Sequence, residues 1–137
     1  MSQLFFRRVT GYNMPISSCS ALLIPSGNSY TVTISTFVGK IEAIGIVIDD
    51  ITAQSINNIF RISINDVDVF NDALMSFIGF CGSDFSSPVF SRLAGSTYMH
   101  YHLKVNLDFE NKIVIAYTNG AVGAKTINMC IHGRWGK

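Results

Sequence analysis

The chain has 137 residues, a formal net charge of +1 and only 14% charged residues. This length predicts one domain over residues 1–137, with enough chain to build a core without help from a metal or a disulfide. The nearly neutral charge gives no field that would attract nucleic acid or an anionic membrane, so we expect neither as a partner.

High apolar content combined with low charge has two interpretations. Hydrophobic residues make up 48% of the chain. They can fill the core of a β domain with a neutral surface, or they can form a surface that copies of the chain or other proteins bury. We favour the second interpretation. The net charge is +3 over residues 1–40, −6 over 41–90 and +4 over 91–137, so opposite patches would favour association if these blocks separate in space.

The sequence contains no targeting signal and no cysteine motif that we recognise. No apolar run is long enough for a transmembrane helix and no secretory signal pattern is present, so we expect synthesis in the cytoplasm without membrane insertion. Cys19, Cys81 and Cys130 form no CxxC pair, which argues against a zinc or redox motif. We expect all three to be free, buried thiols.

The first third of the chain predicts short strands separated by turns. Strands are expected over Leu4–Val9 and Ser17–Ile24, and the second ends at the turn-forming cluster Pro25-Ser26-Gly27-Asn28. Alternating β-branched residues predict a strand over Tyr30–Phe37. Gly39-Lys40 is expected to turn the chain into Ile41–Ile48, an almost wholly apolar strand.

The middle of the chain predicts a hairpin, a helix and a long loop. Asp49–Asn58 is expected to form a loop or one helical turn. The strands Ile59–Ile64 and Val67–Phe70 flank Asn65-Asp66, a pair typical of a two-residue hairpin turn. Asn71–Phe80 is the only segment for which we expect a helix, and Cys81–Ala94 reads as a long loop.

Strict alternation dominates the segment from Tyr98 to Phe109. Successive residues of a strand point to opposite faces of a sheet. One face is predicted to point inward and carries Leu103, Val105 and Leu107; the other carries His102, Lys104 and Asn106. Glu110-Asn111-Lys112 is expected to form a turn leading into a returning strand, IVIAYT. Lys125–His132 is the last predicted strand, followed by a basic tail, Gly133–Lys137.

These elements predict an all-β domain, an antiparallel β-sandwich of about eight strands. We expect a jelly roll rather than an immunoglobulin-like sandwich, because the single Trp follows all three cysteines.

Chemistry-bearing patterns are sparse. His100 and His102 share one face of a strand, and His132 with Glu110 would complete a metal site, but the spacing departs from the cupin pattern. We therefore expect no metal, no cofactor and no catalytic residues. Asp49-Asp50 and Asp66-x-Asp68 lack the spacing of a calcium loop and are interpreted as turn residues.

The long loop and the C-terminal tail carry the predicted interface. Apolar and cationic side chains there are expected to dock on an adjacent subunit rather than remain in water. The candidate interface residues are Phe85, Val89, Phe90, Arg92, Arg134 and Trp135. Arg7-Arg8 and the tail offer too few charges for a nucleic-acid footprint.

The second half of the chain resembles small single jelly-roll virion proteins. The resemblance lies in the strand pair IFRISINDVDVF, a partly apolar loop, YHLKVNLDFENKIVIAYTNG and a short basic end, over roughly residues 58–137. It implies a capsid, spike-base or decoration role in a virion, with the chain itself or other virion structural proteins as partners. No individual position is carried over as a functional residue.

Two other functions remain open at this stage. A carbohydrate-binding β-sandwich would stack Tyr98, Tyr101 or Trp135 on sugar rings, and a cupin-like enzyme would use a metal. The sequence favours a non-enzymatic structural protein that forms homo-oligomers or docks on a larger protein shell.

Overall fold

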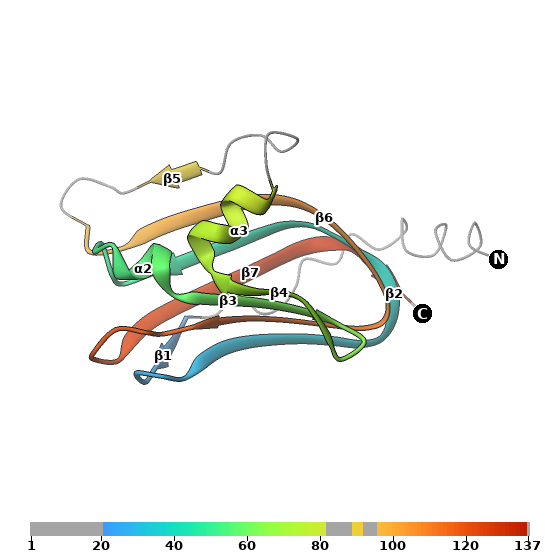
Figure 1. Ribbon diagram of the computed structural model, residues 1–137, viewed down its shortest axis with the longest axis horizontal. Helices are drawn as coiled ribbons and strands as arrows, with labels where there is room; N and C mark the ends of the chain where they lie inside the picture. The colour runs from blue at the N-terminus through green and yellow to red at the C-terminus, as the bar shows by residue number, and fades with distance from the viewer. Residues whose placement is uncertain (1–20, 82–88, 92–95, 137) are drawn as a thin grey trace.

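β-strands make up most of the structure, a computed structural model that describes residues 21–81, 89–91 and 96–136 (Figure 1). The strands are β1 (Leu22–Ile24), β2 (Ser29–Ile48), β3 (Ile59–Ile64), β4 (Val67–Ala73), β5 (Val89–Ser91), β6 (Met99–Thr118) and β7 (Lys125–Gly136). The helices in the described part are α2 (Gln54–Asn57) and α3 (Leu74–Cys81). The all-β prediction is confirmed, whereas the jelly-roll connectivity stays a prediction.

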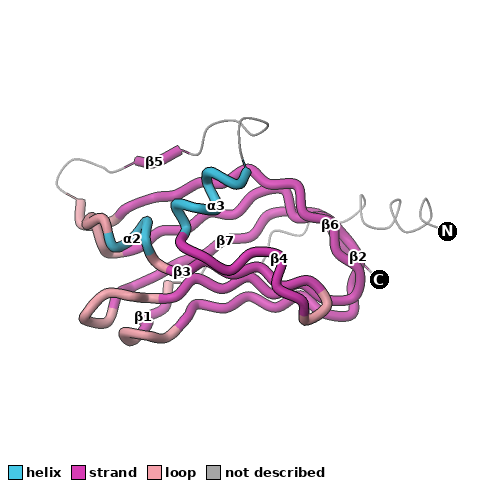
Figure 2. The backbone as a smooth tube through the Cα atoms, viewed as in Figure 1, coloured by secondary structure: helices cyan, strands magenta, loops and turns pink. Residues whose placement is uncertain are grey.

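The described strands form one antiparallel sheet that folds back on itself. Their order is β1-β7-β2-β6-β3-β4, and β5 adds to β6. β2 and β6 are each 20 residues long and pair from Ser29 opposite Thr118 to Ile48 opposite Met99. Both strands curve over at one end of the molecule (Figures 1 and 2). β7 pairs with the second half of β2, from Val38 to Ile48, in one layer. β3 pairs with the second half of β6, from Ile113 to Tyr117, in the other layer. A single sheet therefore supplies both layers of a sandwich.

Irregular backbone positions mark the curve. Thr36 and Asn111 have left-handed φ values of 65° and 77°, and the β2–β6 register shifts between Ser35 and Phe37. A bulge of this kind bends a strand and increases its twist. Thr36 and Asn111 are both exposed, on the outside of the bend.

Two predicted turns are wrong for this reason. Gly39-Lys40 and Glu110-Asn111-Lys112 were expected to separate strands, but each lies inside a continuous strand, β2 or β6. Residues typical of turns lie where the two strands bend, but the pairing of β2 with β6 continues across the bend. Each predicted pair of strands is therefore one long strand.

The predicted faces of the alternating segment are confirmed. Leu103 and Val105 are buried and Leu107 is partly buried, whereas His102, Lys104 and Asn106 are exposed. The core between the two layers also contains isoleucines from the second half of β2 and from β3, β6 and β7. Those with almost no exposed surface are Ile41, Ile44, Ile46, Ile48, Ile62, Ile113, Ile115 and Ile127.

The β3–β4 hairpin forms as predicted, and a helix covers it. Asn65 and Asp66 have φ values of 51° and 66°, as a type I′ turn requires. The helix begins at Leu74 rather than at Asn71, because β4 continues through Ala73. α3 packs against α2, β3 and β4, and its Phe77 ring lies 5.0 Å from that of Phe60. Neither described helix is long and apolar enough to cross a membrane.

The predicted basic tail is part of the sheet. β7 continues to Gly136, and Trp135 pairs with Gly39. A Cβ on Gly39 would lie 2.5 Å from the Trp135 Cβ, so only glycine allows this approach. Trp135 is 5% exposed and belongs to the core of its own chain. The expectation that it lies on a tail outside the fold is wrong.

Cys130 lies on β7 with a half-buried side chain, and it is disulfide-bonded. The expectation that all three cysteines are free thiols is therefore wrong for this residue.

Replacement of Leu103 tests the assignment of the core face. Leu103→Ala should lower the free energy of unfolding by about 2–5 kcal/mol, because it leaves a cavity between the layers. Lys104→Ala, the neighbouring change on the exposed face, is the control and should stay within about 0.5 kcal/mol of the parent. Urea denaturation followed by circular dichroism measures both. A larger loss for Lys104→Ala would show that the two faces are assigned the wrong way round.

Candidate functional site

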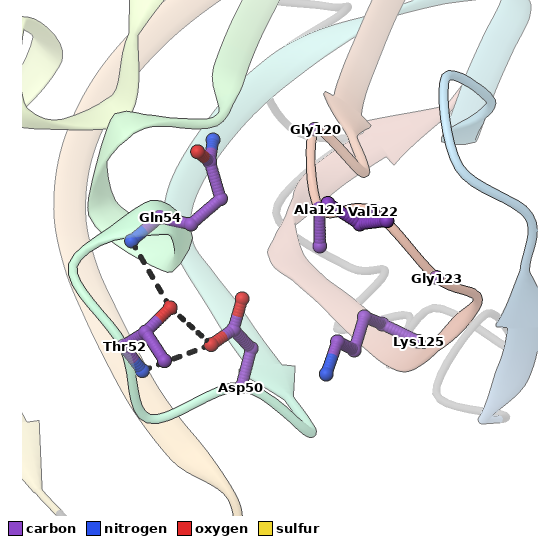
Figure 3. A pocket seen from close by; sticks show the side chains of 8 residues that line it. All are labelled: Asp50, Thr52, Gln54, Gly120, Ala121, Val122, Gly123 and Lys125. Atoms are coloured by element: carbon purple, nitrogen blue, oxygen red, sulfur yellow. Dashed lines mark hydrogen bonds between the residues drawn. The ribbon is translucent and has the colours of Figure 1, made fainter.

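A pocket of about 310 Å³ opens at the end of the sandwich opposite the bend. One wall is formed by Asp50 and Thr52 of the connection from β2 to α2 and by Gln54 at the start of α2. The other is formed by the β6–β7 loop, with Gly120, and by Lys125 at the start of β7 (Figure 3). These walls are about seventy residues apart in the sequence. They meet because Ile48 of β2 pairs with Ile127 of β7, and because the Asp49 amide donates a hydrogen bond to the Thr126 carbonyl.

Asp50 is the most unusual side chain of the pocket, since it is an acidic residue only 4% exposed. One of its carboxylate oxygens accepts hydrogen bonds from the Thr52 amide at 2.9 Å and the Thr52 hydroxyl at 2.6 Å. Its other oxygen accepts no hydrogen bond from the described residues and faces the opposite wall (Figure 3). A buried carboxylate ordinarily has its oxygens satisfied, so this oxygen is available to a ligand or to water.

Lys125 extends from the opposite wall toward Asp50 without forming an ion pair with it in the described part of the chain (Figure 3). The two side chains therefore present one free acceptor and one cationic donor across the same space. This arrangement can hold a small polar molecule that carries both donor and acceptor groups.

Asn58 joins the two walls beneath the pocket. Its side-chain oxygen accepts hydrogen bonds from the Gln54 amide at 2.9 Å and the Gly120 backbone N–H at 3.0 Å. A Cβ on Gly120 would lie 2.9 Å from that oxygen and from the Gln54 nitrogen. A glycine is therefore needed where the loop approaches α2.

Two buried tyrosines continue the polar network into the core. The Ser55 hydroxyl donates to the Thr52 carbonyl, so the Tyr101 hydroxyl is the donor in its 2.5 Å contact with Ser55. The Tyr117 hydroxyl donates to the Ser55 carbonyl and accepts from the Asn58 amide at 3.1 Å. The network ties α2 to both halves of β6.

The buried side chain of Asn119 holds the β6–β7 loop, the second wall of the pocket, in place by hydrogen bonds. Its side-chain nitrogen donates to the carbonyls of Ile24 and Gly123, at 2.9 and 3.0 Å, and its oxygen accepts from the Ala121 amide at 2.9 Å. Asn119 is fully buried. The loop from Gly120 to Ala124 is thus held at its base and against β1.

The network changes the acidity of both tyrosines. Burial raises the pKa of Tyr101; the Ser55 hydrogen bond opposes this change, and the negative charge of Asp50 adds to it. Burial also raises the pKa of Tyr117 well above its ordinary value of 10.0, opposed by the hydrogen bond from Asn58. Both phenols therefore stay protonated and act as hydrogen-bond donors at neutral pH.

Of the predicted interface residues, Arg134 and Trp135 have described side chains, and neither lines this pocket. Phe85 and Arg92 lie outside the described residues. Val89 and Phe90 belong to β5, which pairs with β6, and their side chains are likewise outside the described part. Arg134 is exposed on β7, with its side-chain nitrogen 3.5 Å from a Glu42 oxygen. A docking role for these residues stays a prediction.

The histidines are distributed over two strands. His100 and His102 lie on β6 and His132 on β7, with β2 between them. Among residues 21–77 and 96–136, whose side chains are described, no group of three or more His, Cys, Asp or Glu side chains is placed to hold a metal ion.

The aromatic residues expected of a carbohydrate-binding surface are not exposed together. Tyr101 and Trp135 are buried at 3% and 5% exposure, and only Tyr98 reaches the surface. Two of the three residues that this alternative function needs are therefore core residues.

Sequence reasoning missed the pocket. Asp50 was interpreted as a solvated turn residue, and the 120–123 segment only as a turn between strands. The apolar strand before Asp49-Asp50 and the buried-strand pattern before Asn119-Gly120 were visible signals. The strand register that brings the two connections together cannot be read from the sequence.

Alkaline pH should destabilise the protein through these tyrosines. A raised pKa means that above pH 10 the folded chain holds a phenol proton that the unfolded chain has lost, so stability is retained below pH 10 and falls as pH rises further. Denaturant titrations between pH 8 and pH 11 should show this fall. Tyr117→Phe should be less stable at pH 8, because Asn58 loses its partner, but should show a shallower alkaline slope. If the alkaline slope of stability against pH is the same in Tyr117→Phe as in the parent, Tyr117 is not a source of the alkaline destabilisation.

Comparisons with known proteins identify no family. No family model matches the chain, and no curated protein matches it. Among solved structures, the chain is similar to dimeric latent PorU from Porphyromonas gingivalis, with a TM-score of 0.37 and 10% sequence identity. The similarity covers 92% of this chain and 14% of that one. A likeness this weak supports neither a shared fold family nor a shared function.

Proposed function

We propose that this protein is a non-enzymatic structural protein that assembles into a larger shell through the exposed edge of its sheet at β4. The observation that carries the proposal is that β4, seven residues long, is the terminal strand among the described strands of the sheet and carries exposed apolar side chains. An open edge strand is a template for pairing with another chain.

Four exposed apolar side chains lie on β4 or on the elements next to it. Val67 and Val69 of β4 are 65% and 48% exposed, and the adjoining Ile59 of β3 and Met75 of α3 are 44% and 52% exposed. Exposed apolar groups that lie together favour a protein–protein contact, because their burial removes surface from water.

The edge has little of the protection that monomeric sheets usually carry. Lysine and proline at an edge prevent pairing, and Val67–Ala73 contains neither. One bulge, at Val69, interrupts the ladder with β3 and shortens the regular stretch. Asp68 is engaged with Arg61, whose nitrogen lies 3.5 Å from its carboxylate.

Charge argues for a head-to-tail contact rather than a symmetric one. If two β4 strands paired antiparallel with full overlap, Asp68 of one copy would lie opposite Asp72 of the other, because Val67 would then face Ala73. Like charges directly opposite destabilise a strand pair. A basic segment of another subunit is a better partner, and head-to-tail contacts build rings or filaments.

A virion shell is the assembly that this proposal favours. It rests on the resemblance of residues 58–137 to small jelly-roll virion proteins, together with the low charge of the chain. The finer expectations of jelly-roll connectivity, homo-oligomers and docking on other virion proteins belong to the same proposal.

Sedimentation velocity tests assembly at β4. The parent chain should sediment as an oligomer at micromolar concentration, and negative-stain microscopy should show rings, filaments or closed particles. Val67→Lys with Val69→Lys should give a monomer with an unchanged melting temperature, because both side chains are exposed. Val122→Lys, at a fully exposed valine of the β6–β7 loop, is the matched control and should assemble like the parent.

Two outcomes would refute the proposal. One is a parent chain that stays monomeric at several hundred micromolar and binds no other shell protein. The other is a double variant that forms the same oligomers as the parent and the Val122→Lys control.

A further inference from the structure

We propose that the pocket between the β2–α2 connection and the β6–β7 loop binds a small zwitterion, a molecule of amino-acid or dipeptide size that carries one ammonium and one carboxylate group. The ammonium group of the ligand binds Asp50, and its carboxylate group binds Lys125. This inference concerns the end of the sandwich opposite the bend and goes beyond the proposed assembly at β4.

The buried charge of Asp50 favours a cationic group on the ligand. The residue is only 4% exposed, and its carboxylate forms no ion pair within the described residues. Both hydrogen bonds that it accepts, from the amide and the hydroxyl of Thr52, reach the same oxygen. The second oxygen faces the pocket (Figure 3). An ammonium group gives this oxygen a charged donor, and charge-assisted hydrogen bonds are about twice as strong as neutral ones.

Lys125 supplies the opposite charge from the other wall. It is the first residue of β7, and its half-buried side chain extends across the pocket toward Asp50 (Figure 3). Its ammonium group forms neither an ion pair nor a hydrogen bond within the described part of the chain. A lysine ammonium has three N–H donors and no acceptor, so the group that complements it is an anion such as a carboxylate.

Hydrogen bonds at the base of each wall keep the two charges apart. The side-chain oxygen of Asn58 joins Gln54 to the backbone of Gly120, and Asn119 holds the β6–β7 loop. Both walls are therefore prearranged, which lowers the entropy cost of binding a ligand. A zwitterion between the walls gives each charge an opposite partner without requiring either wall to move.

The size and the lining of the pocket favour a zwitterion over a sugar. Its volume of about 310 Å³ lies at the lower end of the range usual for ligand pockets, about 300–1,000 Å³. No aromatic ring is among the described residues that line it, so a sugar ring has no stacking surface there. Sugar hydroxyls would also leave Asp50 and Lys125 without counter-charges. The apolar part of the lining, Ala121 and Val122, can contact the remainder of the ligand.

Isothermal titration calorimetry of the full chain with glycine and with glycylglycine tests the proposal. At least one of these two zwitterions should bind. Its N-acetylated form, which lacks the ammonium group, and its C-terminal amide, which lacks the carboxylate, should each bind at least tenfold more weakly. The proposal is overturned if neither zwitterion binds at tens of millimolar, or if glucose binds as tightly as the zwitterion.

Replacement of each charge locates the ligand. In Asp50→Asn the amide oxygen can still accept both Thr52 hydrogen bonds, but an N–H group now faces the ligand ammonium, so affinity should fall at least tenfold with an unchanged melting temperature. Lys125→Met keeps a long side chain without its charge and should cause a similar loss. Lys104→Met, on the exposed outer face of β6, is the matched control and should bind like the parent.

The two variants should also differ in which ligand group they no longer recognise. Lys125→Met should bind the zwitterion and its C-terminal amide equally well, whereas Asp50→Asn should no longer distinguish the zwitterion from its N-acetylated form. If Asp50→Asn does not fold, Lys125→Met decides, because its side chain has no polar partner to lose within the described residues. A folded variant at either position that binds the zwitterion as tightly as the parent would refute the proposal.

Discussion

The pairing of β2 with β6 along almost their whole length is the constraint on which the rest of the structure depends. Two strands of 20 residues cannot remain flat in a domain this small, so their common bend converts one sheet into two layers that bury their own inner faces. Each half of the pair then carries its own neighbours, β7 on one layer and β3 with β4 on the other. The bend therefore determines both the core and the two edges of the sheet.

At the end opposite the bend, a network of hydrogen bonds adds to the apolar packing of the core. Tyr101, Tyr117 and Asn119 are buried polar residues, and burial of such groups is unfavourable unless they are hydrogen-bonded. Tyr101 and Tyr117 bind the connection between β2 and β3, and Asn119 binds the β6–β7 loop and β1, so the network holds both connections in place. Asp50 is the exception, because one of its oxygens faces the pocket without a partner among the described residues.

The two edges of the sheet differ in a way that bears on assembly. β4 exposes valines and carries no lysine or proline, whereas β7 is covered by β1 over only three residues. The opposed aspartates of a symmetric β4–β4 pair disfavour that contact, so β4 is better matched to a different surface of the next subunit.

The sequence by itself determined the all-β class, the two faces of the 98–109 segment and the β3–β4 turn, because side-chain alternation and the conformational preferences of Asn65-Asp66 are local properties. It could not show that Gly39 and Asn111 lie within strands, since a bend and a turn use the same residue types and differ only in whether pairing continues. Nor could it show the pocket or the burial of Trp135. Both depend on the register of β7 against β2, which brings Lys125 near Asp50 and Trp135 onto Gly39. Register is set by the fit of whole strands in the core, so only the tertiary structure decides it.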